Sequence, residues 1–415
     1  MTTQVSAGPW RAVVGFGVVS LAADMVYEGA RSVYGPLLGS LGATALVVGL
    51  VTGAGEAIAL VLRLFSGSFA DRTGRYWALT LGGYALTAVC VPLLAITPFL
   101  GAAGLGVATV LILAERTGKA VRSPAKSALL AEAASAVGLG RGLGVHKALD
   151  QVGAFAGPLL VAAGAALTGV LWPSLALLAV PGVVAMLLLV VVRRRMGDPA
   201  GAPAAPAGAS IAAAGDPPAR TWERPAREPL PRVFWLFAAS AGATTAGLVT
   251  FGVISFHLTQ DGVVGLAVVP VVYAGAMAAG AMAALATGWL YERLAGRILL
   301  VLPVLVSAVP LLAFSDRVGV AVAGVLVWGA AVGVQDSTVK ALVADLVPKA
   351  RRATAYGAFA AVQGGAAVLG GGVAGWLYAR SLPALAVVVA ASQLVALALL
   401  AVTVRRRDPV DSLAR

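Results

Sequence analysis

The stretch GSFADRTGR, residues 67–75, is the segment from which the fold of this chain can be worked out. It ends a long apolar run, and a related segment, GWLYERLAGR, ends another apolar run at 288–297. A second repeat agrees with the first, because ALLAE at 128–132 corresponds to ALVAD at 341–345, an offset of 213 residues. Two matches separated by half of the chain indicate that its two halves share one architecture.

The composition places both halves in a membrane. Of the 415 residues, 60% are hydrophobic and only 12% are charged, and the mean hydropathy is +0.92. Soluble domains carry roughly 25% charged residues, so an ordinary cytosolic enzyme is excluded. Apolar runs long enough for helical spans of about 20 residues lie near 11–36, 43–70, 76–97, 101–123, 142–168, 171–192, 233–258, 264–290, 297–315, 317–346, 352–379 and 382–404. We predict an all-α integral membrane protein of twelve transmembrane helices in two pseudo-symmetric six-helix bundles.

The twelve runs divide the chain into four parts. Residues 1–192 form the N-terminal bundle, 233–404 the C-terminal bundle and 405–415 a cytoplasmic tail. Residues 193–232 are rich in Ala, Pro, Gly and Arg, a composition typical of a flexible cytoplasmic linker. A regulatory docking segment is the alternative interpretation of this linker.

The basic residues indicate the orientation. If the N-terminus is cytoplasmic, nineteen Lys and Arg residues fall in cytoplasmic segments, and only Arg317 and Arg380 fall in outer loops. Cytoplasmic loops carry such an excess, so both termini are predicted to be cytoplasmic. The net charge of +12 is therefore a sign of topology, and no nucleic-acid partner is expected.

Several classes of site are excluded or not expected. Cys90 is the only cysteine, and His146 and His257 lie far apart, so neither a cysteine zinc site nor an HExxH helix is possible. The glycine-rich segment GLGRGLG at 138–144 follows no predicted strand, and the chain has no GxxxxGK[ST] motif. ATP-driven transport is excluded, and we expect no cofactor and no metal.

Ionisable residues are unusually frequent inside the predicted spans. Each costs roughly 2.5–3.5 kcal/mol at the bilayer centre and is expected to face a cavity. We predict that they form a proton-coupling and substrate cavity, and they are Asp24, Glu28, Arg31, Glu56, Arg63, Glu115, Arg116, Lys119, Arg122, His146, Lys147, Asp150, Asp336 and Lys340.

Helical spacing groups these residues by face. Asp24, Glu28 and Arg31 share one face of span 1, and Glu28 and Arg31 can pair, which leaves Asp24 uncompensated. Asp24 lies about 20 Å along the helix from its start, near the bilayer centre. Asp24 is therefore the predicted coupling carboxylate, and Asp150 is the next candidate.

Span 4 carries an excess of basic residues. Glu115, Lys119 and Arg122 share one face, and Arg116 is turned about 100° away. Span 1 carboxylates or an anionic substrate are expected to balance them. Two points stay open: whether Glu56 and Arg63 pair or have separate partners, and whether His146 beside Asp150 is a packed polar residue or a proton relay.

The charged loop after span 2 resembles the signature of the major facilitator superfamily, and the resemblance covers the whole chain. The matching residues are Gly67, Asp71, Arg72, Gly74 and Arg75. The resemblance implies a cytoplasmic gate in which Asp71 faces the start of span 11 near Ala353 and Arg75 pairs with Glu132. The second copy supplies Glu292, Arg293, Gly296 and Arg297. A positive-inside loop without a gating role is the alternative.

Two further spans bear on the subgroup. In span 5, Gly144, Gly153, Gly157 and Pro158 resemble the glycine–proline pattern of the superfamily's antiporters, although Val161 and Ala162 replace its final glycines. Generic small-residue packing is the alternative. Span 4 has Ile112 where such antiporters often have arginine, and its run AERTGKAVRSPAK, residues 114–126, resembles a bacterial subgroup with a (D/E)RxGKxxR motif.

The sequence therefore predicts a secondary transporter of the bacterial inner membrane. The expected function is proton-coupled antiport that exports a small organic molecule, drug-like or metabolite, by alternating access around spans 1, 4, 7 and 10. The alternatives are an exchanger or importer of an anionic metabolite and a non-transporting receptor; an enzyme is not expected. The expected partners are the substrate, protons and the lipid bilayer, and the chain is expected to be monomeric.

Overall fold

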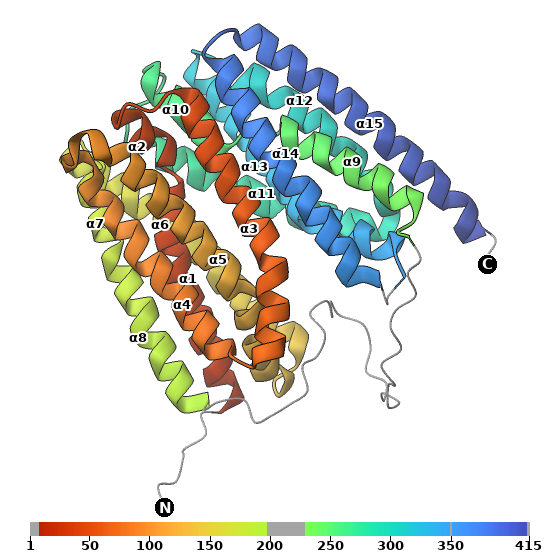
Figure 1. Ribbon diagram of the computed structural model, residues 1–415, viewed down its shortest axis with the longest axis horizontal. Coiled ribbons are helices and arrows are strands. Elements are labelled where there is room, and N and C mark those ends of the chain that lie inside the picture. The colour runs from red at the N-terminus through yellow and green to blue at the C-terminus, as the bar shows by residue number, and fades with distance from the viewer. Residues whose placement is uncertain (1–7, 197–228, 349–350, 413–415) are drawn as a thin grey trace, which may run out of the picture.

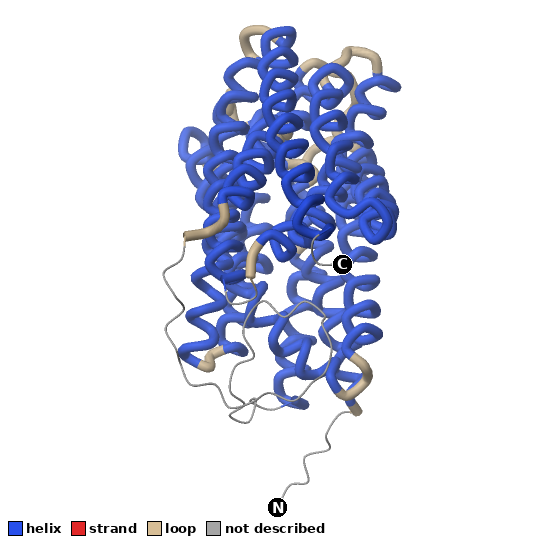
Figure 2. The backbone as a smooth tube through the Cα atoms, turned by 90° about the vertical axis from the view of Figure 1, so that its right-hand side faces the viewer, coloured by secondary structure: helices blue, strands red, loops and turns tan. Residues whose placement is uncertain are grey.

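Two groups of helices lie side by side in the computed structural model, which describes residues 8–196, 229–348 and 351–412 (Figure 1). Within these ranges all regular elements are helical, and no strand is found (Figure 2). The N-terminal half contains α1 (Pro9–Arg31), α2 (Tyr34–Ser40), α3 (Ala45–Thr73), α4 (Tyr76–Leu93), η1 (Leu94–Phe99), η2 (Gly101–Ala103), α5 (Gly104–Ser135), α6 (Leu139–Thr168), α7 (Trp172–Leu177) and α8 (Ala179–Met196).

The C-terminal half repeats this plan. It contains α9 (Arg232–Gly247), α10 (Phe251–Gln260), α11 (Val268–Leu294), η3 (Ala295–Leu300), α12 (Val301–Ala313), α13 (Val318–Leu346), α14 (Arg352–Tyr378) and α15 (Leu382–Ser412). Most of the predicted linker, residues 197–228, lies outside the described residues.

The predicted fold is confirmed. Among the described residues, eleven segments are long and apolar enough to cross a membrane. The twelfth span is α5, which carries Glu115, Arg116 and Lys119 within two turns and is therefore less apolar than the others.

Some span boundaries differ from the prediction. The first span ends at Arg31, and α2 follows as a separate helix. The seventh span is interrupted after Gly247 and resumes at Phe251. At the other end of the bundle, α5 continues to Ser135 and α15 continues into the predicted tail.

The charged turn after α3 has a local cause. Gly74 ends α3 with φ +65°, in the left-handed region, and its N–H donates to the Ala70 carbonyl. Glycine adopts this conformation without steric cost. The glycine of the GSFADRTGR segment is thus the residue that reverses the chain.

The helices α6 and α14 are related by the same offset that the sequence repeats show. A Cβ added to Gly157 of α6 would lie 2.2 Å from the Met25 carbonyl oxygen of α1, and one added to Gly370 of α14 would lie 2.2 Å from the Ala246 carbonyl oxygen of α9. Gly370 is 213 residues after Gly157. The α1–α6 and α9–α14 contacts are therefore equivalent.

The halves meet tightly at the end of the bundle that holds α2 and α10. There a Cβ added to Gly49 of α3 would lie 2.0 Å from the Gly371 carbonyl oxygen of α14. Toward the opposite end the same two helices separate, because a Cβ on Gly357 would have Leu64 at 3.9 Å as its nearest neighbour. Figure 1 shows the two halves diverging toward the end where the N-terminus lies. We name these the closed end and the open end.

Candidate functional site

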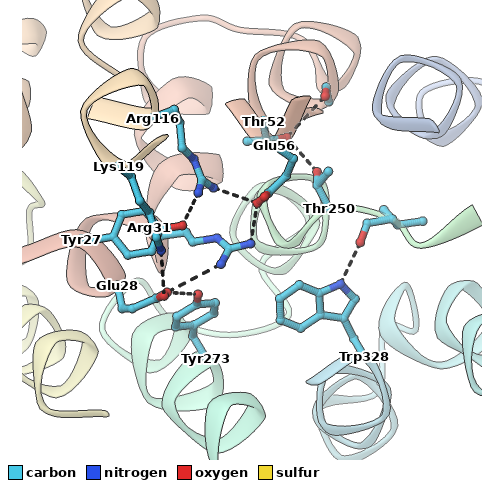
Figure 3. Close-up of polar contacts among 12 residues, drawn as sticks. Tyr27, Glu28, Arg31, Thr52, Glu56, Arg116, Lys119, Thr250, Tyr273 and Trp328 are labelled. Atoms are coloured by element: carbon cyan, nitrogen blue, oxygen red, sulfur yellow. Dashed lines mark hydrogen bonds and ion pairs between the residues drawn. The ribbon is translucent and has the colours of Figure 1, made fainter. Parts of the chain in front are cut away.

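A group of seven ionisable side chains, which we name the central cluster, lies where the two halves meet (Figure 3). It consists of Tyr27, Glu28 and Arg31 from α1, Glu56 from α3, Arg116 and Lys119 from α5, and Tyr273 from α11. Its centre is Glu56, whose Oε1 atom lies 2.6 Å from Nη2 of Arg31 and 2.8 Å from Nη2 of Arg116. One carboxylate oxygen is thus held between two guanidinium groups.

The second carboxylate of the cluster, Glu28, joins the two halves. Its oxygens lie 3.8 Å from Nη1 of Arg31 and 3.9 Å from Nζ of Lys119. The hydroxyl of Tyr273 donates a hydrogen bond to Oε2 of Glu28 at 2.5 Å. Because Tyr273 belongs to the C-terminal half, this hydrogen bond crosses the interface.

The ring of Tyr27 organises the basic side chains. Lys119 Nζ lies 3.2 Å from the ring centroid, and the Cζ atoms of Arg116 and Arg31 lie 5.0 Å and 5.9 Å from it. Arg116 also donates a hydrogen bond to the Tyr27 hydroxyl. Such cation–π contacts help to hold these like charges close together.

The central cluster has three basic and two acidic side chains, so it carries one unbalanced positive charge. It is also accessible: the side chains of Glu56 and Lys119 are 32% and 26% exposed, whereas that of Arg116 is 4% exposed. An unbalanced charge in a solvent-accessible site inside a membrane protein attracts a counter-ion.

A polar contact across the interface lies beside the cluster. The hydroxyls of Thr52 in α3 and Thr250, just before α10, are 2.8 Å apart. Trp328 of α13 is 2% exposed and donates to the Val249 carbonyl at 2.8 Å. Figure 3 shows both groups next to Arg31 and Glu56.

A second ionisable group lies one turn of α1 away. The carboxyl groups of Asp24 and Asp150 lie close enough to interact electrostatically, and we name them the carboxyl pair. Nζ of Lys147 lies 2.7 Å from Oδ2 of Asp150. Lys119 and Lys126 both act electrostatically on Asp24, so Lys119 connects the carboxyl pair to Glu28 of the central cluster.

His146 lies near this pair but bonds elsewhere. Its Nε2 is 2.9 Å from the Ser20 hydroxyl, which also accepts from Nζ of Lys126 at 3.1 Å. The ring is 6% exposed. His146 is therefore a packed polar residue beside the carboxyl pair in this conformation.

The grouping predicted for span 4 is wrong. Lys119 points with Arg116 toward α1 and α3, whereas Glu115 and Arg122 turn toward α4. There Glu115 accepts from Thr87 at 3.3 Å, and Arg122 donates to the same hydroxyl. Lys119 lies only about 60° from Arg116 around the helix, and its flexible side chain covers that angle. Glu115, at 0% exposure, belongs to the interior of the N-terminal half rather than to the accessible site.

Of the remaining predicted cavity residues, Arg63 and Asp336 are members of neither group. Arg63 has a buried Nε without a hydrogen-bond partner among the described residues, and Glu56 does not pair with it. Asp336 is exposed and acts electrostatically on Lys147. The side chain of Lys340 lies outside the described residues.

Only one of the two predicted gate contacts lies wholly within the described residues. Asp71 accepts a hydrogen bond from Tyr76 in its own half at 3.1 Å, and the side chain of Ala353 lies outside the described residues. Within the described ranges, no ion pair joins Arg75 to Glu132. Both residues lie at the open end, where the halves have separated.

The second copy of the loop has contacts of its own. The guanidinium of Arg293 lies 3.9 Å from the Trp289 ring centroid, and Glu292 is exposed. The Tyr291 hydroxyl, from the same segment, donates to Asp345 at 2.8 Å. Asp345 is the repeat equivalent of Glu132, so this loop contacts the expected helix through a tyrosine.

The glycines of predicted span 5, which is α6, differ in how closely other helices approach them. Gly153 and Gly157 let α6 approach the α1 backbone, because a Cβ on either would lie 2.2 Å from a carbonyl oxygen of Leu21 or Met25. Nothing lies within 4 Å of a Cβ on Gly144. The close approach is what holds Asp150 against Asp24.

Sequence reasoning missed several members of the site. Lys126 was detectable, because it lies seven residues after Lys119 on the same helical face. Tyr273 gave no local signal, since its partner Glu28 is 245 residues away. In the part of the chain that the structure describes, no three His, Cys, Asp or Glu side chains are grouped as metal ligands.

Comparisons with known proteins agree on one family. The sequence matches the family described as Major Facilitator Superfamily over residues 16–315 and 264–415. An uncharacterized protein of Mycobacterium tuberculosis is 52% identical over 399 residues, covering 96% of this chain and 94% of that protein.

Solved structures show the same fold at low identity. A mutant of the nucleoside transporter NupG superposes with a TM-score of 0.72 at 12% identity, covering 94% of this chain and 99% of that one. A mutant of the peptide transporter POT in complex with sulfate superposes with a TM-score of 0.72 at 14% identity, covering 95% and 94%.

Proposed function

Since the chain belongs to the major facilitator superfamily and is a secondary transporter, we propose that it moves a small organic anion together with protons. The observation that carries this proposal is the position of Lys119. It interacts with Glu28 in the central cluster at 3.9 Å and electrostatically with Asp24 of the carboxyl pair. Lys119 thus interacts both with the proposed proton-binding group and with the proposed anion-binding site.

The carboxyl pair is the proposed proton site. Two adjacent carboxyl groups can share a proton, because two neighbouring negative charges repel each other. The groups that face the pair are Lys119 and Lys126 of α5 and His146 and Lys147 of α6. Movement of these helices during alternating access would change the affinity of the pair for its proton.

The sign of the coupling follows from charge. When the carboxyl pair holds its proton, Lys119 has one negative neighbour fewer, and the positive charge of the central cluster is more available to an anion. Proton and anion therefore favour each other's binding, and linkage makes this effect reciprocal. Mutual stabilisation supports co-transport, which corresponds to the importer of an anionic metabolite that the sequence left as an alternative.

Proton-coupled antiport, with export of a small organic molecule, is the second candidate function. The observation that favours it is the packing of Gly153 and Gly157 against α1, which matches the antiporter-like motif. In an antiporter the substrate and the proton compete for one conformation, so this candidate requires the opposite sign of coupling.

We propose that the protein lies in a bacterial inner membrane with both termini in the cytoplasm, and that a single copy transports alone. With this orientation the open end faces the cytoplasm, and the chain is inward-facing. The gate formed by Gly67, Asp71 and Arg75 would then close only in the outward-facing state.

Proton flux into proteoliposomes tests the function. The protein is reconstituted with a pH dye inside, and lactate or mandelate is added outside; protein-free liposomes correct for passive entry of the acid. Co-transport acidifies the lumen, whereas antiport makes it alkaline. Asp24→Asn should abolish the proton flux but preserve exchange of labelled anion, because binding is retained while the proton site is lost.

The exposed loop residue Asp316 supplies the control. Asp316→Asn should leave the proton flux unchanged. If Asp24→Asn proteoliposomes still accumulate anion when a pH gradient is imposed, Asp24 does not couple transport, and Asp150→Asn is the next variant to measure.

A further inference from the structure

Three polar side chains of the C-terminal half converge where the N-terminal half has its carboxyl pair. Nε2 of Gln335 in α13 and Nε2 of Gln363 in α14 both donate to the hydroxyl of Thr245 in α9, at 3.0 Å and 3.3 Å. We name Thr245, Gln335 and Gln363 the amide group.

The internal symmetry explains the position of the amide group. The equivalent backbone contacts of Gly157 with Met25 and of Gly370 with Ala246 make Asp24 the counterpart of Thr245. The offset of 213 makes Asp150 the counterpart of Gln363. The carboxyl pair of one half is thus replaced in the other by a hydrogen-bonded hydroxyl and amide, which carry no charge and bind no proton.

The amide group and Glu56 lie on the same side of a polar contact between the two halves. The Thr52–Thr250 hydrogen bond fixes the two halves relative to each other. From it, Glu56 lies one turn, about 6 Å, along α3 toward the open end. Thr245 lies in the last turn of α9, beyond the non-helical residues 248–250, in the same direction. Both positions are therefore displaced from that hydrogen bond toward the open end.

One atom of the amide group is left unsatisfied. Oε1 of Gln335 is buried and has no hydrogen-bond partner among the described residues. A buried acceptor without a donor costs roughly 1–3 kcal/mol, so a ligand that donates a hydrogen bond to it is favoured. Thr245 and Gln335 are partly exposed as residues, so a rotation of the Gln335 amide would bring Oε1 within reach of a ligand.

We propose that the amide group is a second subsite, which binds a hydrogen-bond-donating hydroxyl or amide of the anion whose charged end binds the central cluster. The substrate class is then a small organic anion with one negative charge and an uncharged donor, such as a hydroxy acid. This inference rests on the proposed function for the charged end of the ligand only.

Matched pairs of acids test the subsite. Thermal stabilisation of the purified full-length protein in detergent is titrated with lactate against propionate and with mandelate against phenylacetate. Each pair has the same charge and differs by one hydroxyl. We expect the hydroxy acid to bind about 2- to 12-fold more tightly, the effect of one neutral hydrogen bond.

Two neighbouring threonines supply matched variants. Thr245→Val removes the hydroxyl of the amide group and should bring the two acids of each pair to equal affinity, and Gln335→Leu should do the same. Thr244→Val is the control, because Thr244 is 3% exposed and its hydroxyl bonds to the Ser240 carbonyl of its own helix at 3.0 Å. It should keep the preference.

The outcomes separate this inference from the proposed function. If hydroxy acids and their deoxy analogues bind equally to the unaltered protein, or if Thr244→Val abolishes the preference as Thr245→Val does, the subsite is overturned and the anion site stands. If no acid binds but neutral lactamide binds more tightly than propionamide in a Thr245-dependent way, the subsite stands and the anion proposal falls. If no probe of either kind binds, both are overturned.

Discussion

Single residues decide the charge of the candidate site, and Glu56 is the most informative of them. Its carboxylate lies between Arg31 and Arg116 at 2.6 Å and 2.8 Å, where the carboxylate of a substrate would bind equally well. Glu56 is also the most exposed acid of the central cluster, at 32% of its side chain. We interpret it as an internal counter-ion that an anionic substrate displaces.

Replacing Glu56 should therefore strengthen binding. In Glu56→Gln, Arg116 loses its anionic partner and Arg31 keeps only Glu28 at 3.8 Å, and the charge of the cluster rises by one unit. We expect anions such as mandelate to bind roughly tenfold more tightly, since a hydrogen bond to a charged group contributes about 1.5 kcal/mol or more. Calorimetric titration of the purified protein measures the change, with Asp316→Asn as the carboxylate-to-amide control. Unchanged or weaker binding would mean that Glu56 is not displaced.

Glu56 and Asp24 should also differ in transport. Glu56 is not part of the carboxyl pair, so its replacement should reduce proton flux less than Asp24→Asn does. A complete loss of flux in Glu56→Gln, at normal anion exchange, would transfer the coupling role to Glu56.

At the scale of helices, the contact of α3 with α14 closes one end of the transporter. It depends on glycines, because a Cβ on Gly371 would lie 2.2 Å from the Gly49 carbonyl oxygen. Backbone cannot move aside as a flexible side chain can. Alternating access requires this contact to break and to form again.

Gly371→Ala should destabilise the closed end. Overpacking typically costs about 1–3 kcal/mol, so this variant should unfold at a lower temperature and favour the state in which α3 and α14 separate. A cysteine placed at Thr52, which is 8% exposed, should then react faster with a thiol reagent. Gly365→Ala on the same helix is the control, because nothing lies within 4 Å of its added Cβ. Equal reactivity in both variants would show that the contact does not hold this end closed.

At the scale of the whole molecule, the orientation in the membrane decides which end of the bundle faces the cytoplasm. The closed end carries the loops after α2 and α14, and the open end carries the GSFADRTGR loop. Ser40 and Arg380 are exposed at the closed end, and Thr73 is exposed at the open end. The positive-inside distribution predicts that the closed end is external.

Thiol labelling of intact cells checks this orientation. On a Cys90→Ala background, cysteines at Ser40 and Arg380 should react with an impermeant reagent, and a cysteine at Thr73 should react only after the membrane is permeabilised. The three positions serve as controls for one another. The reverse pattern would invert the orientation, and the chain would then be outward-facing in this conformation.

The sequence by itself determined the architecture of this protein. Apolar runs of sufficient length must form helices in a bilayer, because no water is present to satisfy a free backbone. The offset of 213 residues already related Gly157 to Gly370 and Asp150 to Gln363. The depth of Asp24 near the bilayer centre stays a prediction from helical rise.

Only the tertiary structure decided which charges meet. Helical periodicity fixes the angles between side chains around one axis, and this is why Glu28 was expected near Arg31. It does not fix how that helix is rotated toward its neighbours. The rotation of α5 about its axis places Lys119 beside Arg116 and turns Glu115 toward α4. The packing of the two halves against each other brings Tyr273 to Glu28. These contacts depend on packing between helices that are distant in sequence, which no local pattern specifies.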